Sequence, residues 1–231
     1  MSAAPLRSRM SRVLEPEVMD SQSEAHDYDS MDHGEVNRRF VSDFLTAAHQ
    51  AGLPPDAPVL DLGTGTAQIP IELCRQNPRA QVWAIDLAEP MLERARANVA
   101  AAGLNDQIRL ERHDAKQLPF AAERFAAVIS NSIVHHIPEP GDALAEALRV
   151  VQSRGVIFVR DLARPLDSDA VRHLVDTYAA GCNDHQRQLF ASSLHAALSV
   201  AEVRALVTSL GYEGRTVTAT SDRHWTWIAC K

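Results

Sequence analysis

Apolar runs of strand length alternate with segments of helical periodicity along most of this chain. The runs predict strands at 57–62, 80–86, 107–112, 125–131 and 155–161, and the periodic segments predict helices at 35–52, 67–77, 88–103 and 141–152. Pro54 and Pro55 end the first helix, and Gly103 ends the third in the manner of a C-cap. This alternation predicts a doubly wound α/β fold, with a mostly parallel sheet covered by helices on both faces.

The pattern changes after residue 164. The stretch 167–198 is helical and longer than a simple crossover needs, so we expect a helical cap insertion over about 164–198. A further helix is predicted at 200–210, and the segments 213–220 and 224–230 are predicted to form an antiparallel pair. Residues 36–231 are therefore expected to form a single domain on a seven-stranded sheet with an antiparallel closing strand. Residues 1–35 would precede it as an arm or lid.

The end of the first strand carries the strongest chemical signal, in the sequence Val-Leu-Asp-Leu-Gly-Thr-Gly-Thr-Ala-Gln at 59–68. The chain turns on Gly63 and Gly65, which leaves backbone N–H groups free and lets a ligand approach closely. Nucleotide-type cofactors bind at such turns. Asp61 would repel a pyrophosphate but attract a cationic amino group, and Gln68 follows where a dinucleotide fingerprint has its third glycine. The turn therefore suits a nucleoside that carries positive charge rather than NAD.

Three further strand ends carry polar residues. Asp86 closes the second strand 21 positions after Gly65, Asp114 follows the third strand, and Asn131 ends the fourth. Together with the acid-x-Gly-x-Gly turn, this order resembles the class I S-adenosylmethionine-dependent methyltransferases of the small-molecule type, over residues 36–161. The resemblance implies a Rossmann-like fold with S-adenosyl-L-methionine as cofactor. It also implies that Asp86 binds the ribose hydroxyls and that Asp114 meets the adenine amino group.

The resemblance predicts a set of cofactor contacts at these strand ends and on the arm. They are Tyr28, Asp61, Gly63, Thr64, Gly65, Asp86, Leu87, Met91, Asp114, Ala115 and Asn131. Structural alternatives remain open, because an Asp at a strand end is most often a turn former or a helix N-cap. Asp86 could cap the helix that begins near Glu89, and Tyr28 could be a surface residue of a mobile arm.

Two regions could shape an acceptor site. Ser132–Pro140 follows the fourth strand, faces the methyl donor in the family, and contains His135 and His136. We predict His136 as a base or acceptor-orienting group, since the pKa of histidine lies near neutrality. Adjacent histidines are expected to point in different directions, so at most one lines the site, and a loop histidine bonded to backbone is the alternative. The second region, 159–165 with polar residues at 184–195, could line a polar pocket or form a solvated face.

The charge and composition of the chain indicate which classes of partner to expect. The formal charge is −7, and Lys116 and Lys231 are the only lysines. Acidic residues accumulate between Val13 and Glu35 without a single Lys or Arg, so a phosphate-rich partner such as nucleic acid is not expected. No apolar stretch approaches the roughly 20 residues that span a bilayer, so no membrane partner is predicted. A small-molecule acceptor fits best, and homo-oligomer formation stays open.

The cysteines and histidines add two expectations. Cys74, Cys182 and Cys230 are odd in number and widely spaced, which argues against a disulfide framework and favours a reducing, cytoplasmic compartment. His135, His136, Asp161 and His185 match no metal-ligand spacing, so no metal is predicted.

The activity expected from the resemblance is in-line methyl transfer from S-adenosylmethionine to a small acceptor. Two alternatives stay open: other S-adenosylmethionine chemistry on the same fold, and a non-catalytic cofactor-binding subunit. The acidic segment 13–33 is expected to close over the cofactor as a gate, with Tyr28 and Met19 as its inward contacts.

Overall fold

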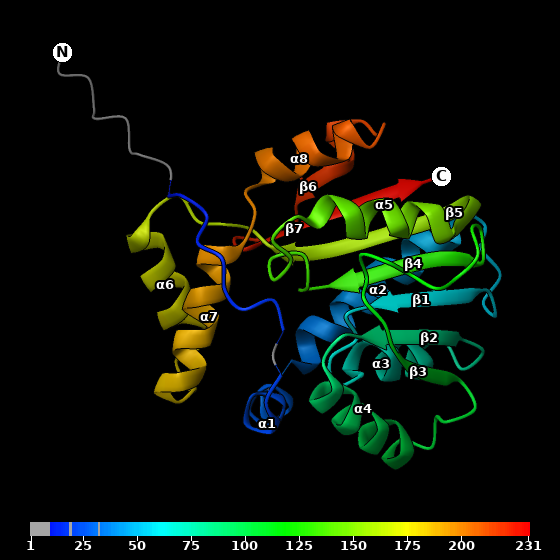
Figure 1. The fold of residues 1–231 in the computed structure, drawn as a ribbon, viewed down its shortest axis with the longest axis horizontal. Helices are drawn as coiled ribbons and strands as arrows, with labels where there is room; N and C mark the ends of the chain where they lie inside the picture. The colour runs from blue at the N-terminus through cyan, green and yellow to red at the C-terminus, as the bar shows by residue number, and fades with distance from the viewer. Residues whose placement is uncertain (1–9, 19, 32) are drawn as a thin grey trace.

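The computed structural model describes residues 10–18, 20–31 and 33–231 (Figure 1). Met19, one of the two expected inward contacts of the arm, lies outside the described residues. The elements in chain order are α1 (Gln22–Ser30), α2 (Gly34–Gln50), β1 (Pro58–Leu62), α3 (Gln68–Gln76), β2 (Gln81–Asp86), α4 (Glu89–Ala101), β3 (Ile108–Arg112), β4 (Phe125–Asn131), α5 (Pro140–Val150), β5 (Val151–Leu162), α6 (Ser168–Tyr178), α7 (Asp184–Ala196), α8 (Val200–Ser209), a 3₁₀ turn (Gly214–Thr216), β6 (Val217–Ala219) and β7 (His224–Cys230).

The strands form one seven-stranded sheet in the order β3-β2-β1-β4-β5-β7-β6. Strands β1 to β5 are parallel, whereas β7 runs antiparallel to both β5 and β6. The predicted fold class is confirmed, including the antiparallel closing pair. The chain leaves β1 toward β2 and β3 and then returns to β4 on the other side of β1. In such a sheet the crevice outside the carboxyl ends of β1 and β4 is the expected ligand site.

Helices cover both faces of the sheet (Figure 1). Apolar side chains of α2, α3 and α4 pack together with one face, and those of α5 and α8 pack with the other. All residues of strand β4 except the last are buried between these two layers. A strand buried on both faces is apolar throughout, which is why the apolar run predicted it. The interior of the sheet is thus apolar, and its polar residues lie at the ends of the strands.

The predicted cap is a pair of helices, α6 and α7, which share a small apolar cluster with Leu162 at the end of β5. The arm crosses this cap before it enters α1. Its backbone amides at Met10 and Val13 donate to the carbonyls of Leu166 and His195. The Arg12 guanidinium donates to four backbone carbonyls, those of His135, Ile137, Pro138 and Ala196. The arm therefore joins the cap to the turn that follows β4.

Three elements differ from expectation. Helix α1 was not predicted, since only Ala25 of its residues is buried. Strand β6 spans three residues because the 3₁₀ turn takes the start of the predicted strand at 213–220. Strand β5 begins at Val151 instead of residue 155, and its irregular start includes Arg154 with a φ of 67°. None of these differences moves the carboxyl ends of β1, β2 or β4.

Within the described residues, no helix combines the length and apolar character needed to cross a membrane. The cytoplasmic location stays a prediction.

Candidate active site

A pocket opens at the carboxyl ends of β1, β2 and β4, where the topology places a ligand site. Its lining includes most of the predicted cofactor contacts: Tyr28, Gly63, Gly65, Asp86, Leu87, Met91, Asp114, Ala115 and Asn131. Asp61 and Thr64 line a smaller hollow that shares Tyr28, Gly63 and Asn131 with it. All eleven predicted positions therefore lie around one connected region, although contact of each with a cofactor stays a prediction.

The glycine turn is built from residues in the left-handed region of φ. Gly63 has a φ of 69°, and Gly65 has one of 55°. A Cβ added at Gly63 would lie 2.1 Å from Ile133 Cγ2, so only glycine fits between β1 and the turn after β4. A Cβ added at Gly65 would lie 3.7 Å from Tyr28 Cε1, so the tyrosine ring lies beside the turn. The turn leaves room on the pocket side for a ligand.

Asp61 is a buried carboxyl group without a full set of partners. It is 2% exposed, and its Oδ2 atom has no hydrogen-bond partner among the described residues. Burial raises the pKa of Asp61 to about 7, and the negative charge of Asp86 acts in the same direction. A cationic group in the adjoining hollow would stabilise the ionised carboxylate. The geometry therefore fits the predicted role of Asp61 in holding an amino group.

Asp86 has both a structural role and a place in the pocket. Its Oδ2 accepts a hydrogen bond from the Gly65 amide at 2.8 Å, and its Oδ1 accepts from the Ala88 amide at 2.9 Å. Burial raises the pKa of Asp86, and these backbone donors oppose the rise. A carboxylate has about four lone-pair positions, so two remain for the hydroxyls of a ribose. The alternative that Asp86 caps this helix is wrong, because the N-cap of α4 is Ala88 and no side chain among the described residues bonds to the helix start. Asp86 instead shapes the turn before α4, which does not exclude ligand binding.

Asp114 and Asn131 complete the strand ends. Asp114 Oδ1 accepts from the Lys116 amide at 2.9 Å and lies 3.1 Å from Lys116 Nζ, so this acid also shapes its own turn. Asn131 Oδ1 is buried and has no partner among the described residues. Buried polar atoms are ordinarily hydrogen-bonded, so a free amide oxygen beside the pocket marks a place where a ligand donor fits.

The arm closes one side of the pocket. Tyr28 and Val18 line it and pack with Met91 and Ala88 of the α4 region. Glu17 pairs with Lys116, which fixes the arm to the loop after β3. Burial raises the pKa of Tyr28 to about 12, and nearby Asp86 and Asp61 contribute, so its hydroxyl stays protonated. Val18, Glu17 and Lys116 were not predicted as site residues, because nothing in their local sequence distinguishes them from other arm and loop residues.

The two histidines occupy a turn at 134–136, and both lie close to the arm. His136 lines the pocket, whereas His135 is buried and its Nδ1 lies 2.5 Å from Asp161 Oδ1. Their rings are 4.2 Å apart, so the expectation that the two side chains point in different directions is wrong, although only one of them, His136, is in the pocket lining. The physical reason is the turn, because successive side chains alternate in direction only in extended backbone. Burial, with a contribution from His135, lowers the pKa of His136 to about 3.

The second predicted acceptor region does not line either pocket. Arg160 is buried and donates to Thr226 Oγ1 and to Asp43. Arg164 donates to the Ala197 carbonyl and pairs with Glu202. His185 lies 3.2 Å from Asp27 at the arm, and Arg187 pairs with Asp176 within the cap. These contacts are structural, but the alternative of a solvated face is wrong for residues 159–162, which are buried.

The sheet order, the antiparallel β7 and the acid-x-Gly-x-Gly turn at the switch point define the class I S-adenosylmethionine-dependent methyltransferase fold. Residues 59–155 match the family model described as "Methyltransferase domain". This match covers less than half of the chain, and over that region it agrees with the predicted resemblance.

Two curated relatives and one solved structure illustrate the similarity. The chain is 36% identical over 128 residues to a ubiquinone/menaquinone biosynthesis C-methyltransferase of Desulfotalea psychrophila, covering 55% of this chain and 48% of that protein. It is 36% identical over 107 residues to a phosphatidylethanolamine N-methyltransferase of Cereibacter sphaeroides, covering 46% and 51%. A putative S-adenosyl-L-methionine-dependent methyltransferase of Methanococcus maripaludis superposes with a TM-score of 0.68 at 18% identity, covering 96% of this chain and 97% of that one. The chain spans about half the length of these curated relatives.

Proposed function

We propose that this protein transfers a methyl group from S-adenosyl-L-methionine to a small-molecule acceptor. The observation that carries the proposal is the convergence of Asp61, Asp86 and the Gly63–Gly65 turn at the switch point of a methyltransferase domain. The unpartnered oxygens of Asp61 and Asn131 are where the amino and other polar groups of such a cofactor find acceptors. The names of the two relatives point to carbon and to nitrogen as the methylated atom, so the acceptor atom is left open.

The chain's contribution to this reaction is to position the reactants. The cofactor supplies a methyl group on a cationic sulfur, which is already a good leaving group. Holding donor and acceptor close, aligned and away from water contributes about 7–11 kcal/mol to lowering a barrier of this kind. The glycine turn allows close approach, Asp86 fixes the ribose end, and the arm with Tyr28 covers the region from solvent. A covalent nucleophile is not required.

His136 is proposed to orient the acceptor. Its position in the pocket lining supports a contact with whatever fills that side. The lowered pKa of about 3 makes its imidazole neutral near pH 7 and a weak base, since proton transfer works best when the pKa lies near the working pH. An orienting role therefore fits His136 better than that of a general base.

The proposed activity is tested by incubating the protein with methyl-labelled S-adenosylmethionine and a panel of small acceptors that includes a demethylated quinol and phosphatidylethanolamine. We expect S-adenosylhomocysteine to form with label on one acceptor. Formation of methylthioadenosine would favour different chemistry on the same fold. Tight cofactor binding with no turnover across the panel and across a cell extract of small molecules would favour the non-catalytic alternative.

Cofactor affinity is expected to depend on pH through Asp61. The free protein holds a proton on this group below about pH 7, and a bound ammonium favours the ionised form, so binding must release the proton. Affinity for S-adenosylhomocysteine should therefore rise about tenfold between about pH 6 and pH 8 and then level off. Calorimetry over this range measures the effect. Asp61→Asn should flatten the dependence of affinity on pH, whereas His113→Gln, at another residue of the pocket lining, should leave it unchanged. The same dependence in Asp61→Asn as in the parent would contradict the assignment.

A further inference from the structure

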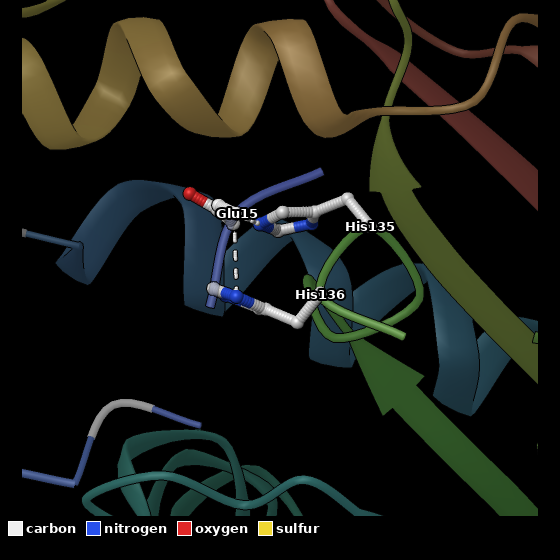
Figure 2. Close-up of side chains that lie close together, drawn as sticks. All are labelled: Glu15, His135 and His136. Atoms are coloured by element: carbon white, nitrogen blue, oxygen red, sulfur yellow. Dashed lines mark ion pairs between the residues drawn. The ribbon is translucent and has the colours of Figure 1, made fainter. Parts of the chain in front are cut away.

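A separate group of side chains lies where the arm crosses the turn after β4. Figure 2 shows Glu15 from the arm facing His135 and His136 from the turn. Glu15 Oε1 lies 3.2 Å from His136 Nδ1 and 3.5 Å from His135 Nε2. One nitrogen or oxygen atom from each residue lies within 4.8 Å of the other two. Two imidazole nitrogens and one carboxylate oxygen thus lie around a common point.

We propose that Glu15, His135 and His136 bind a divalent transition-metal ion. A tetrahedral ion with ligands at about 2.0–2.1 Å places neighbouring ligand atoms about 3.3 Å apart, which is close to the separations of 3.2 and 3.5 Å between Glu15 Oε1 and the two histidine nitrogens. Imidazole nitrogen suits Zn²⁺ or Fe²⁺, whereas Mg²⁺ and Ca²⁺ take oxygen ligands. Three protein ligands leave at least one coordination position for another molecule.

The hydrogen bonding of these atoms supports the proposal. Glu15 Oε1 and His136 Nδ1 are both buried, and neither has a hydrogen-bond partner among the described residues. The Glu15 side chain is only 11% exposed. Leaving a buried polar atom without a partner costs about 1–3 kcal/mol, and more when the group is charged. A metal ion at the common point would satisfy both atoms at once.

Asp161 prepares His135 as a ligand. Its Oδ1 lies 2.5 Å from His135 Nδ1, so a proton held between these two atoms would leave Nε2, which is 3.5 Å from Glu15 Oε1, to bind the ion. Asp161 is itself held by the backbone amides of Val134 and Leu162, each at 2.6 Å. A carboxylate behind a histidine ligand is the arrangement that commonly orients such ligands. Glu15 and Asp161 together also supply two negative charges to balance the ion.

The competing interpretation is a protonated His135 held between Glu15 and Asp161 as an ion pair. That arrangement uses both His135 nitrogens, and it leaves His136 Nδ1 3.2 Å from Glu15 Oε1 without the geometry of a hydrogen bond. The earlier expectation of no metal rested on the spacing of histidines and acids, and Glu15 had no part in it because it is remote in the sequence. Because His136 also lines the pocket, the proposed ion would lie at the pocket wall. Its binding does not depend on the proposed methyl transfer.

Direct metal titration tests the proposal. Tag-free protein, stripped with a chelator, is titrated with Zn²⁺ by calorimetry and with Co²⁺ by visible absorption. We expect one ion per chain with a Kd of about 1 μM or tighter, and a Co²⁺ spectrum of nitrogen and oxygen ligation. Glu15→Gln and His136→Gln should each weaken binding by at least about tenfold, as losses around metal sites typically do. His173→Gln, at an exposed histidine of α6, is the matched control and should bind as the parent does.

Two results would overturn the proposal. One is a parent protein that takes up neither ion at one per chain, which would leave the His135 ion pair as the explanation. The other is unchanged affinity in both ligand variants while they still unfold cooperatively on heating. If neither variant folds, the stoichiometry and the Co²⁺ spectrum of the parent decide alone.

Discussion

Gly63→Ala is expected to destabilise the protein by about 2–5 kcal/mol and to weaken S-adenosylhomocysteine binding by about a hundredfold or more. Two costs add. A residue with a Cβ in the left-handed region costs about 1–2 kcal/mol, and forcing extra volume into a packed site costs about 1–3 kcal/mol. The second cost arises because the new Cβ would lie 2.1 Å from Ile133 Cγ2, so a side chain that lines the pocket must move. Urea unfolding and calorimetry measure the two effects.

Gly52→Ala is the matched control for backbone strain. Gly52 has a φ of 74°, yet a Cβ there would meet no atom within 4 Å. It should therefore show the strain cost alone and bind ligand normally. In Gly63→Ala, a second change of Ile133→Ala should recover part of the stability by removing the clash. Equal destabilisation by Gly63→Ala and Gly52→Ala would show that close packing against Ile133 is unimportant.

Asp86→Ala is expected to lower the affinity for S-adenosylhomocysteine by about ten- to a hundredfold, that is, by about 1.5–3 kcal/mol. The change removes the proposed acceptor for two ribose hydroxyls. It also removes the acceptor of the Gly65 amide, so the glycine turn loses a support that holds it in shape. Asp86→Asn should lose less, since its carbonyl can still accept, although its NH₂ group must then face one of the two backbone donors.

Asp167→Ala is a control for Asp86→Ala, because it removes a carboxylate that bonds to the backbone at a helix start but does not line the pocket. Asp167 is the N-cap of α6, and its Oδ1 accepts from the Ala170 amide at 2.9 Å, remote from the pocket lining. Its loss should lower the free energy of unfolding by about 0.5–2 kcal/mol without changing affinity. If Asp86→Ala behaves in the same way, with ligand binding intact in the folded protein, Asp86 is only a structural residue.

The sheet and its ligand-binding edge could be predicted because a strand buried on both faces is a continuous run of apolar residues. Strand β4 is apolar until its last residues, where Asn131 meets the pocket, and β2 likewise ends in Asp86. Polar residues at the ends of otherwise buried strands therefore indicated the edge that binds ligand. Their order along the chain, together with the glycine turn, carried the family resemblance, and the resemblance placed them around one cofactor.

Helix α1 escaped prediction because its residues are mainly polar and show no apolar face. One local signal was available in the sequence Ser21-Gln-Ser-Glu24. The Ser21 side chain accepts from the Glu24 amide, and its hydroxyl donates to the Glu24 carboxylate. Ser followed three residues later by Glu is a known mark of a helix start. The acidic segment 13–33 therefore contains a capped helix that its lack of an apolar face does not predict.

Glu15 could not be placed from sequence at all. It sits among other acids of the arm, and its neighbours in space come from the turn after β4. The orientation of His135 and His136 was equally hidden, because it depends on whether their backbone is extended or turned. Contacts between segments so distant along the chain carry no local pattern for periodicity to detect.

The hydrogen bonds of Arg12 have a consequence for synthesis of the protein. This side chain leaves the ribosome early, but its partners include the carbonyls of Pro138 and Ala196. The arm thus has no complete docking surface until the cap helices have been translated, so its attachment should be among the last folding steps. Until then the arm cannot cover the strand ends at Gly63 and Asp86, so the covered pocket should form only after residue 196 has left the ribosome.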